Sequence, residues 1–219
     1  MSITDLTPPS PRSRQLAPLI VIEGPDGTGK TTLARAIAAA AAPAVLIHGN
    51  RHGDDPVGRP RNELIMRAYH SALLAKAQEA RRLGHAVVMN QHWLSHVIYG
   101  VAAGRLTPGQ AATYRQWFSP LVGRLRAFYV FALDEACLDA PQDPDHPRDV
   151  AYLRELIRAY EAEYLARQTA GERVIPYLWR AHGATPEALE RFARLVLSLA
   201  TSKAPSNCKT DPTNPVDLP

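Results

Sequence analysis

The feature that most constrains this chain of 219 residues is a glycine-rich segment, Gly24–Thr31, set between an apolar run and an alanine-rich run. The segment matches the pattern G-x-x-x-x-G-K-[ST] at every position. The preceding run, Leu19–Glu23, has the composition of a buried strand, and Thr31–Ala42 has high helix propensity. Glycines in such a turn let backbone N–H groups converge, and the helix start adds the positive end of its dipole. The segment therefore predicts a loop that binds a chain of phosphates.

A phosphate-binding loop of this kind predicts ATP and Mg²⁺ as cofactors. Lys30 is expected to bridge the β- and γ-phosphates and to act in catalysis, and the Thr31 hydroxyl is expected to bind Mg²⁺. The residues predicted to contact the nucleotide are Gly24, Pro25, Asp26, Gly27, Thr28, Gly29, Lys30, Thr31 and Thr32.

Strand-like and helix-like segments alternate along the rest of the chain. The expected strands are 19–23, 44–48, 86–89, 127–133 and 174–178. The expected helices are 31–42, 61–83, 95–103, 108–118, 150–168 and one that Thr185-Pro186-Glu187 opens. This alternation predicts an α/β, three-layer P-loop NTPase fold, with a five-stranded parallel sheet flanked by helices and ligands at the carboxyl ends of the strands. The kinase-type domain would span 19–200, between a disordered arm, 1–18, and a disordered tail, 201–219.

Composition narrows the function without deciding it. The net charge is +4, and arginine supplies most of the positive charge, because the chain has few lysines. Arginine suits phosphate-bearing partners, although a GC-rich genome would explain the bias equally well. The two cysteines, Cys137 and Cys208, form no zinc or disulfide motif. No apolar run reaches membrane-spanning length and no signal peptide is evident, so we expect no membrane partner and a cytoplasmic location, in the host cytoplasm if the protein is viral.

Two segments resemble the thymidylate kinase family. Ile20–Leu33 (IVIEGPDGTGKTTL) is similar to the family's E-G-x-D-G-x-G-K-T-T loop, and Val87–Gly100 (VVMNQHWLSHVIYG) is similar to its D-R-[YHW]-x-x-S-x-x-[AI]-Y stretch, particularly in the phage form. A weaker match lies at Tyr129–Glu135. The resemblance implies an ATP-dependent phosphotransferase that acts on a nucleotide.

The resemblance also implies roles for single residues. Asp26 matches a carboxylate that meets the deoxyribose 3′-hydroxyl, and Tyr99 matches a tyrosine beside the sugar. Ser95 would support the site from the same stretch. Segment 136–149 takes the place of the lid, whose only arginine, Arg148, is the candidate to neutralise the transferred phosphoryl group, with a plain surface arginine as the alternative.

The chain departs from the family where Asp-Arg is expected, because it has Asn90-Gln91 there. Asn90 can still orient a water on Mg²⁺ through its amide oxygen, so it is retained as a catalytic candidate. Gln91 is neutral and cannot form a bidentate pair with an acceptor phosphate. Tyr69 is a candidate to stack on a pyrimidine, with core packing as the alternative.

Three interpretations of this departure stay open. In the first, another arginine, among Arg51, Arg59, Arg61 and Arg67, holds the phosphate of dTMP or another deoxynucleoside monophosphate, with Arg61 retained as a substrate residue. In the second, which we favour, the acceptor is a hydroxyl, because related phage kinases phosphorylate 5-hydroxymethyluracil within DNA during thymine hypermodification. The third interpretation is a nucleotide-binding protein without activity. The oligomeric state is also open, with a homodimer as one alternative.

Overall fold

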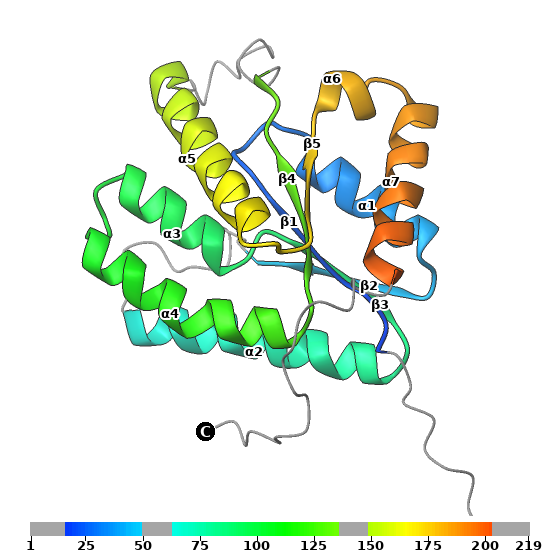
Figure 1. Ribbon diagram of the computed structural model, residues 1–219, viewed down its shortest axis with the longest axis horizontal. Coiled ribbons are helices and arrows are strands. Elements are labelled where there is room, and N and C mark those ends of the chain that lie inside the picture. Colours follow the sequence, from blue (N-terminus) through cyan, green and yellow to red (C-terminus); the bar gives the residue numbers. More distant parts are fainter. Residues whose placement is uncertain (1–15, 50–62, 136–148, 203–219) are drawn as a thin grey trace, which may run out of the picture.

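The computed structural model describes residues 16–49, 63–135 and 149–202 (Figure 1). Five parallel strands form one sheet in the order β2-β3-β1-β4-β5. The strands are β1 (Leu19–Glu23), β2 (Ala44–His48), β3 (Ala86–Asn90), β4 (Phe128–Ala132) and β5 (Val174–Tyr177). All five lie where the alternating sequence pattern predicts them. The predicted α/β fold class is therefore confirmed.

Helices cover both faces of the sheet, as Figure 1 shows. One face carries α1 (Lys30–Ala40) and α7 (Pro186–Thr201), and the other carries α2 (Glu63–Arg82), α3 (Trp93–Ala102), α4 (Pro108–Arg124) and α5 (Val150–Thr169). A short helix, α6 (Trp179–His182), links β5 to α7. The three-layer arrangement follows from the parallel strands, because each crossover must return over a face of the sheet.

Two elements differ from the sequence prediction. Helix α4 was expected to end at Phe118, but it continues to Arg124 with Pro120 inside it. A proline interrupts one hydrogen bond, yet the buried side chain of Val122 keeps the last turn packed on the core. Helix α6 was not predicted, because four residues are too short for a periodic pattern.

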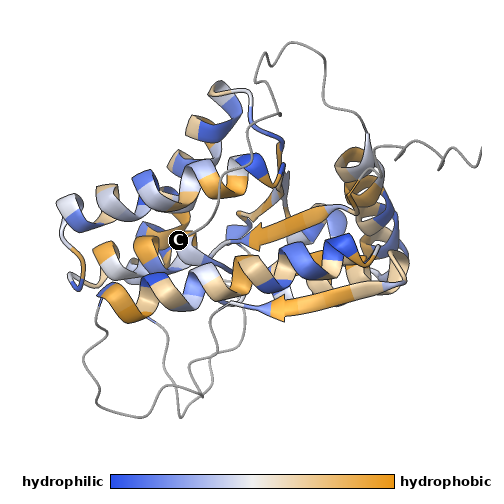
Figure 2. Ribbon diagram, turned by 90° about the horizontal axis from the view of Figure 1, so that it is seen from below, coloured by the Kyte–Doolittle hydropathy of each residue, from blue (hydrophilic) through white to orange (hydrophobic). Residues whose placement is uncertain are grey.

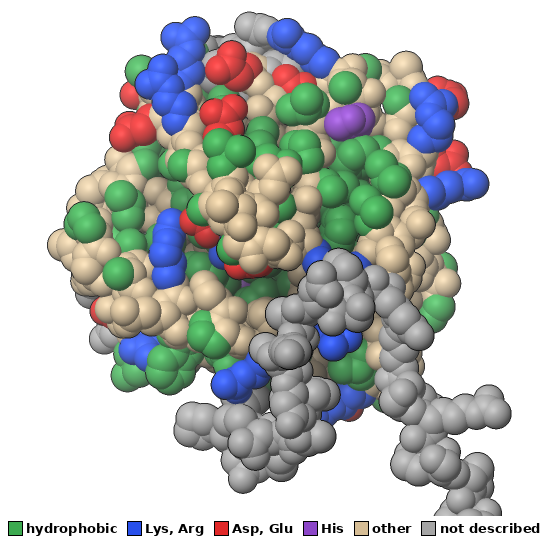
Figure 3. Space-filling view, in the orientation of Figure 1, with side chains coloured by type: hydrophobic (Ala, Val, Ile, Leu, Met, Phe, Trp, Pro, Cys, Tyr) green, Lys and Arg blue, Asp and Glu red, His purple; other side chains and the backbone are tan. Residues whose placement is uncertain are grey.

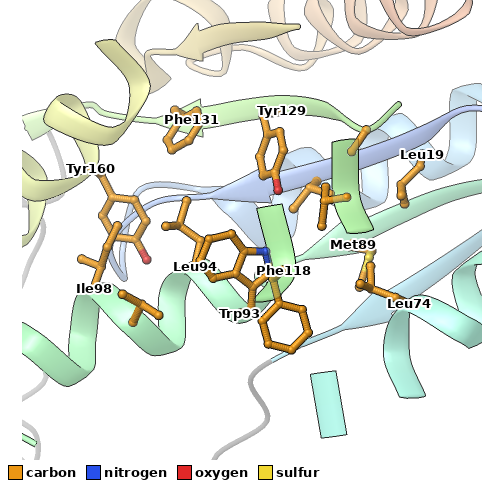
Figure 4. Packing of buried hydrophobic residues seen from close by; sticks show 14 of the residues in the cluster. Leu19, Leu74, Met89, Trp93, Leu94, Ile98, Phe118, Tyr129, Phe131 and Tyr160 are labelled. Atoms are coloured by element: carbon orange, nitrogen blue, oxygen red, sulfur yellow. The ribbon is translucent and has the colours of Figure 1, made fainter. Parts of the chain in front are cut away.

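The alternation of side chains along β1 divides the core in two. Leu19 and Val21 face α2–α5, whereas Ile20 and Ile22 face α1 and α7. The strand arrows seen in Figure 2 are accordingly largely hydrophobic, as expected for a parallel sheet buried on both faces. The larger cluster is built around aromatic rings (Figure 4), with Trp93 stacked on Phe118 at 5.7 Å between ring centroids.

The register of the strands brings the ends of three segments together. Asn90, the last residue of β3, lies beside Ile22 of β1 and beside His48 of β2. The glycine-rich loop starts just after β1. The loop and the polar residues that end β2 and β3 therefore meet at the carboxyl edge of the sheet, where ligands bind in folds of this class.

Candidate active site

The glycine-rich loop has a backbone that only glycine fits at two positions. Gly24 has a φ of 146°, and a Cβ placed on it would lie 2.4 Å from the carbonyl oxygen of Ala132. Gly29 has a φ of 80°, and a Cβ there would lie 2.8 Å from the ring of Trp179. The loop is thus wedged between the end of β4 and helix α6. This close packing holds the loop over the N-terminus of α1, in the geometry of an anion cradle.

Lys30 lies inside this cradle. Its side chain is only 6% exposed, and its Nζ donates to the Pro25 carbonyl at 2.5 Å and lies 3.6 Å from Asp26 Oδ1. The Thr28 hydroxyl donates to the same carbonyl at 2.8 Å. A buried ammonium group within a glycine-rich loop at a helix N-terminus is suited to a polyanion. The loop therefore fits the triphosphate of ATP.

Asn90 connects the end of β3 to the first turn of α1. Its Nδ2 donates to Thr31 Oγ1 at 3.1 Å and lies 3.4 Å from His48 Nδ1. Its Oδ1 is buried and accepts no hydrogen bond within the described part of the chain. A hydroxyl and an unused amide oxygen are oxygen ligands of the kind that Mg²⁺ or its water shell takes, beside nucleotide phosphates. Thr31 and Asn90 therefore fit a nucleotide-bound Mg²⁺.

Gln91 has an uncommon backbone conformation, with a φ of 64°. Its N–H donates to the Ile22 carbonyl at 2.8 Å, and its side-chain Nε2 is 3.5 Å from the Gly24 carbonyl. Gly49 packs so closely that a Cβ on it would lie 1.9 Å from the Gln91 carbonyl oxygen. A left-handed conformation at a residue with a side chain costs about 1–3 kcal/mol and is retained where the surrounding structure imposes it. The chain therefore holds a neutral amide against the loop.

Tyr99 reaches the loop from α3. Its hydroxyl accepts a hydrogen bond from the Asp26 backbone N–H at 2.8 Å. Burial, and then the negative charge of Asp26, raise the pKa of Tyr99, so it remains a neutral hydroxyl. The structure thus brings together Asp26 and Tyr99, which the family resemblance placed beside a sugar. Asp26 keeps most of its side chain exposed, at 65%.

Ser95 acts through a residue that the sequence interpretation missed. Its hydroxyl donates to the Glu23 carboxylate and lies 2.7 Å from the Tyr160 hydroxyl. The other Glu23 oxygen accepts from the His92 backbone N–H at 3.0 Å. Glu23 is fully buried, and this burial raises its pKa to about 7, against 4.5 for an exposed carboxyl group. The signal in the sequence was a carboxylate that ends an otherwise apolar strand.

Glu23 ties the loop to the segment that follows β3. Because the residue directly precedes Gly24, its hydrogen bonds to His92 and Ser95 hold the start of α3 against the base of the loop. The same bonds anchor the chain immediately after Gln91. Glu23 is thus a positioning residue for the whole edge.

Three histidines lie next to this edge. His70 of α2 has its ring 5.1 Å from that of His92 and 5.7 Å from that of His96, with Phe118 alongside. Burial lowers the pKa of His70 to about 2 and that of His92 to about 4, so both rings are neutral at pH 7. In the described ranges, no group of three or more His, Cys, Asp or Glu side chains is arranged to hold a metal ion. The cluster packs α2 against α3 and α4.

Of the remaining predicted residues, the structure describes Tyr69 and Arg67 but not the others. Tyr69 is 39% exposed, with its ring 5.3 Å from that of His70, which leaves part of its surface accessible. Arg67 places its guanidinium 3.9 Å from the centre of the Trp117 ring on α4. The residues Arg51, Arg59, Arg61 and Arg148 lie outside the described residues, and so does segment 136–148 of the predicted lid.

Known proteins resemble this chain in structure but not in sequence. No protein-family model matches the chain, and no curated protein matches it in sequence. Among solved structures, a thymidylate kinase from Candida albicans is similar over 84% of this chain and 92% of its own, with a TM-score of 0.58 and 15% identity. A deoxyadenosine kinase from M. mycoides with bound dATP covers 82% and 98%, with a TM-score of 0.55 and 12% identity.

A third similar structure is the YorR protein from Bacillus subtilis in complex with phosphorylated GDP, which covers 82% of this chain and 96% of its own (TM-score 0.52, 16% identity). At these identities the likeness shows the fold alone: the chain has the architecture of P-loop nucleotide and nucleoside kinases. In the described residues no helix is long and apolar enough to cross a membrane.

Proposed function

We propose that this protein is an ATP-dependent phosphotransferase that acts on a thymine-like pyrimidine deoxynucleotide and transfers the phosphoryl group to a hydroxyl. The observation that carries the proposal is the pairing of a complete phosphate loop, with Lys30 buried in it, and the neutral edge Asn90-Gln91. The loop supports phosphoryl transfer from ATP. The neutral edge supports an acceptor without a phosphate beside the reacting atom.

In this proposal, the residues of the site bind the nucleotide and orient the acceptor. Backbone amides of the loop and Lys30 would hold the phosphates, and Thr31 with Asn90 would hold the Mg²⁺ side of the nucleotide. Bound Mg²⁺-ATP supplies the phosphoryl group and neutralises the charge that develops on it. Asp26 and Tyr99, which a hydrogen bond joins, would contact the deoxyribose. Such a site works by positioning and electrostatics, so a change of acceptor needs no new nucleophile chemistry.

The acceptor we favour is the 5-hydroxymethyl group of hydroxymethyldeoxyuridine in DNA. Gln91 supports this choice, because its amide can donate to or accept from a hydroxyl but cannot balance a phosphate dianion. A base in a duplex would have to be flipped out to reach the loop. On the face shown in Figure 3, basic side chains are scattered among acidic ones.

A dTMP kinase is the main alternative, and the fold likeness to a thymidylate kinase favours it. It requires an arginine to bind the acceptor phosphate. Of the four candidate arginines, Arg67 places its guanidinium over the Trp117 ring, and the other three lie outside the described residues. A lesser alternative is a nucleotide-binding protein without transfer activity, for which the substitution of Asp-Arg by Asn90-Gln91 is the only argument.

Incubation with γ-labelled ATP and separate acceptors tests these alternatives. We expect label on single-stranded DNA that contains hydroxymethyldeoxyuridine, and none on the same strand with thymidine. Label on dTMP alone would replace the favoured acceptor with the monophosphate. Absence of transfer to every acceptor, with ATP binding intact, would indicate the inactive protein. Lys30→Ala should abolish transfer, whereas Lys76→Ala, which removes an exposed lysine of α2, should not.

A further inference from the structure

The amide of Asn90 raises an orientation problem that a carboxylate does not have. The two ends of an asparagine side chain have the same shape, but one end donates hydrogen bonds and the other accepts them. Turned one way, the group offers an oxygen to a cation or its water shell. Turned the other way, it offers an NH₂ group, which repels a cation. An asparagine at this position therefore needs neighbours that select one orientation.

Two groups next to Asn90 make this selection when His48 is in the tautomer that leaves Nδ1 without a proton. Asn90 Nδ2 donates to Thr31 Oγ1 at 3.1 Å and lies 3.4 Å from His48 Nδ1. Thr31 alone would not suffice, because a hydroxyl can donate as readily as it accepts. An imidazole nitrogen that carries no proton can only accept. With NH₂ drawn to His48, Oδ1 is left buried and accepts no hydrogen bond from any described residue.

The sheet holds His48 in this place. His48 and Asn90 are paired residues at the ends of the parallel neighbours β2 and β3. The next residue, Gly49, donates its N–H to the Asn90 carbonyl at 3.0 Å. Gly49 also packs directly on the Gln91 backbone, where no Cβ would fit. The backbone therefore fixes residue 48 next to residue 90, so that the imidazole starts from a position beside the amide.

We infer that His48 is a positioning residue that turns the Asn90 amide so that its oxygen serves the metal ion of the bound nucleotide. This inference rests on the proposed use of ATP with Mg²⁺. His48 contacts neither nucleotide nor acceptor in this role. A carboxylate at position 90 would offer an oxygen in either orientation, whereas the amide needs His48 to orient it.

A double-mutant cycle on nucleotide binding tests the inference. The quantity measured is the gain in affinity for a non-hydrolysable ATP analogue when Mg²⁺ replaces EDTA, by titration calorimetry. His48→Leu should reduce this gain about tenfold, as expected when the partner of a metal-side group is lost. His48→Asn, which keeps an acceptor near the position of Nδ1, should restore most of it. In the Asn90→Asp background, His48→Leu should change the gain by less than about twofold, because a carboxylate needs no orientation.

Controls separate the possible failures. His85→Leu removes a partly buried histidine at the opposite end of β3 and should leave the gain at its wild-type value. If His48→Leu behaves like His85→Leu, or lowers the gain equally with Asn90 and with Asp at position 90, the inference is wrong. If the wild-type protein itself shows no Mg²⁺-dependent gain, the proposed function fails instead. Affinity measured in EDTA reports any general damage to the loop.

Discussion

Glu23 should make the stability of this protein depend on pH in an unusual direction. The carboxyl group is fully buried and its pKa is raised from 4.5 to about 7. The folded chain therefore holds the proton more tightly than the unfolded chain between these values. Stability from this group is fully present below pH 4.5 and is lost as the pH rises through 7. At about 1.4 kcal/mol for each pH unit, the loss amounts to about 3 kcal/mol.

The substitution Glu23→Gln removes this effect, because an amide keeps the shape of the acid and does not ionise. The free energy of unfolding of each protein would be measured by urea denaturation from pH 4.5 to pH 8. The difference between variant and wild type should rise by about 3 kcal/mol across this range, in favour of the variant. The free energy of the wild type must be subtracted from that of the variant at each pH. Buried His92, whose pKa is lowered to about 4, makes both proteins lose stability as the pH falls below 6.5.

The exposed carboxylate Glu161 of α5 supplies the matched control. Glu161→Gln should shift the free energy of unfolding by less than about 0.5 kcal/mol, as usual for a surface side chain. A difference for Glu23→Gln that stays flat with pH would refute the reasoning, because burial would then not dominate the pKa of Glu23. A difference that falls with pH would mean that the hydrogen bonds from His92 and Ser95 outweigh burial.

Three further outcomes are expected. Gly24→Ala should abolish ATP binding and lower the free energy of unfolding by about 2 kcal/mol, because the new Cβ would meet the Ala132 carbonyl. Calorimetry and urea unfolding measure these two effects. Gly123→Ala in α4 is the control, because a Cβ there has nothing within 4 Å. Gln91→Arg should tighten dTMP binding, which equilibrium dialysis would detect; unchanged binding would remove Gln91 from the acceptor site. Trp93→Ala should cost about 3–5 kcal/mol of stability, because it removes a fully buried ring and leaves a cavity beside Phe118. A loss below 1 kcal/mol would contradict the packing in Figure 4.

Local patterns in the sequence were sufficient for the fold. The loop Gly24–Thr31 is recognisable because its chemistry depends on residues adjacent in the chain, and the strands because apolar runs must be buried on both faces of a parallel sheet. The ends of elements were less predictable. Helix α4 runs through Pro120 because tertiary packing of its last turn outweighs the local penalty.

Relations between distant residues were decided by the tertiary structure. The sequence marked Asn90, Gln91, Ser95 and Tyr99 as one stretch, but it could not show that they meet different partners. The register of β2 and β3 places His48 beside Asn90, and burial at the end of β1 turns Glu23 into a proton-holding anchor. Hydrogen bonding and desolvation depend on which groups share a space, and the order of residues along the chain does not specify this by itself. The sequence alone therefore predicted a phosphate-binding loop, and only the folded sheet determined which side chains surround it.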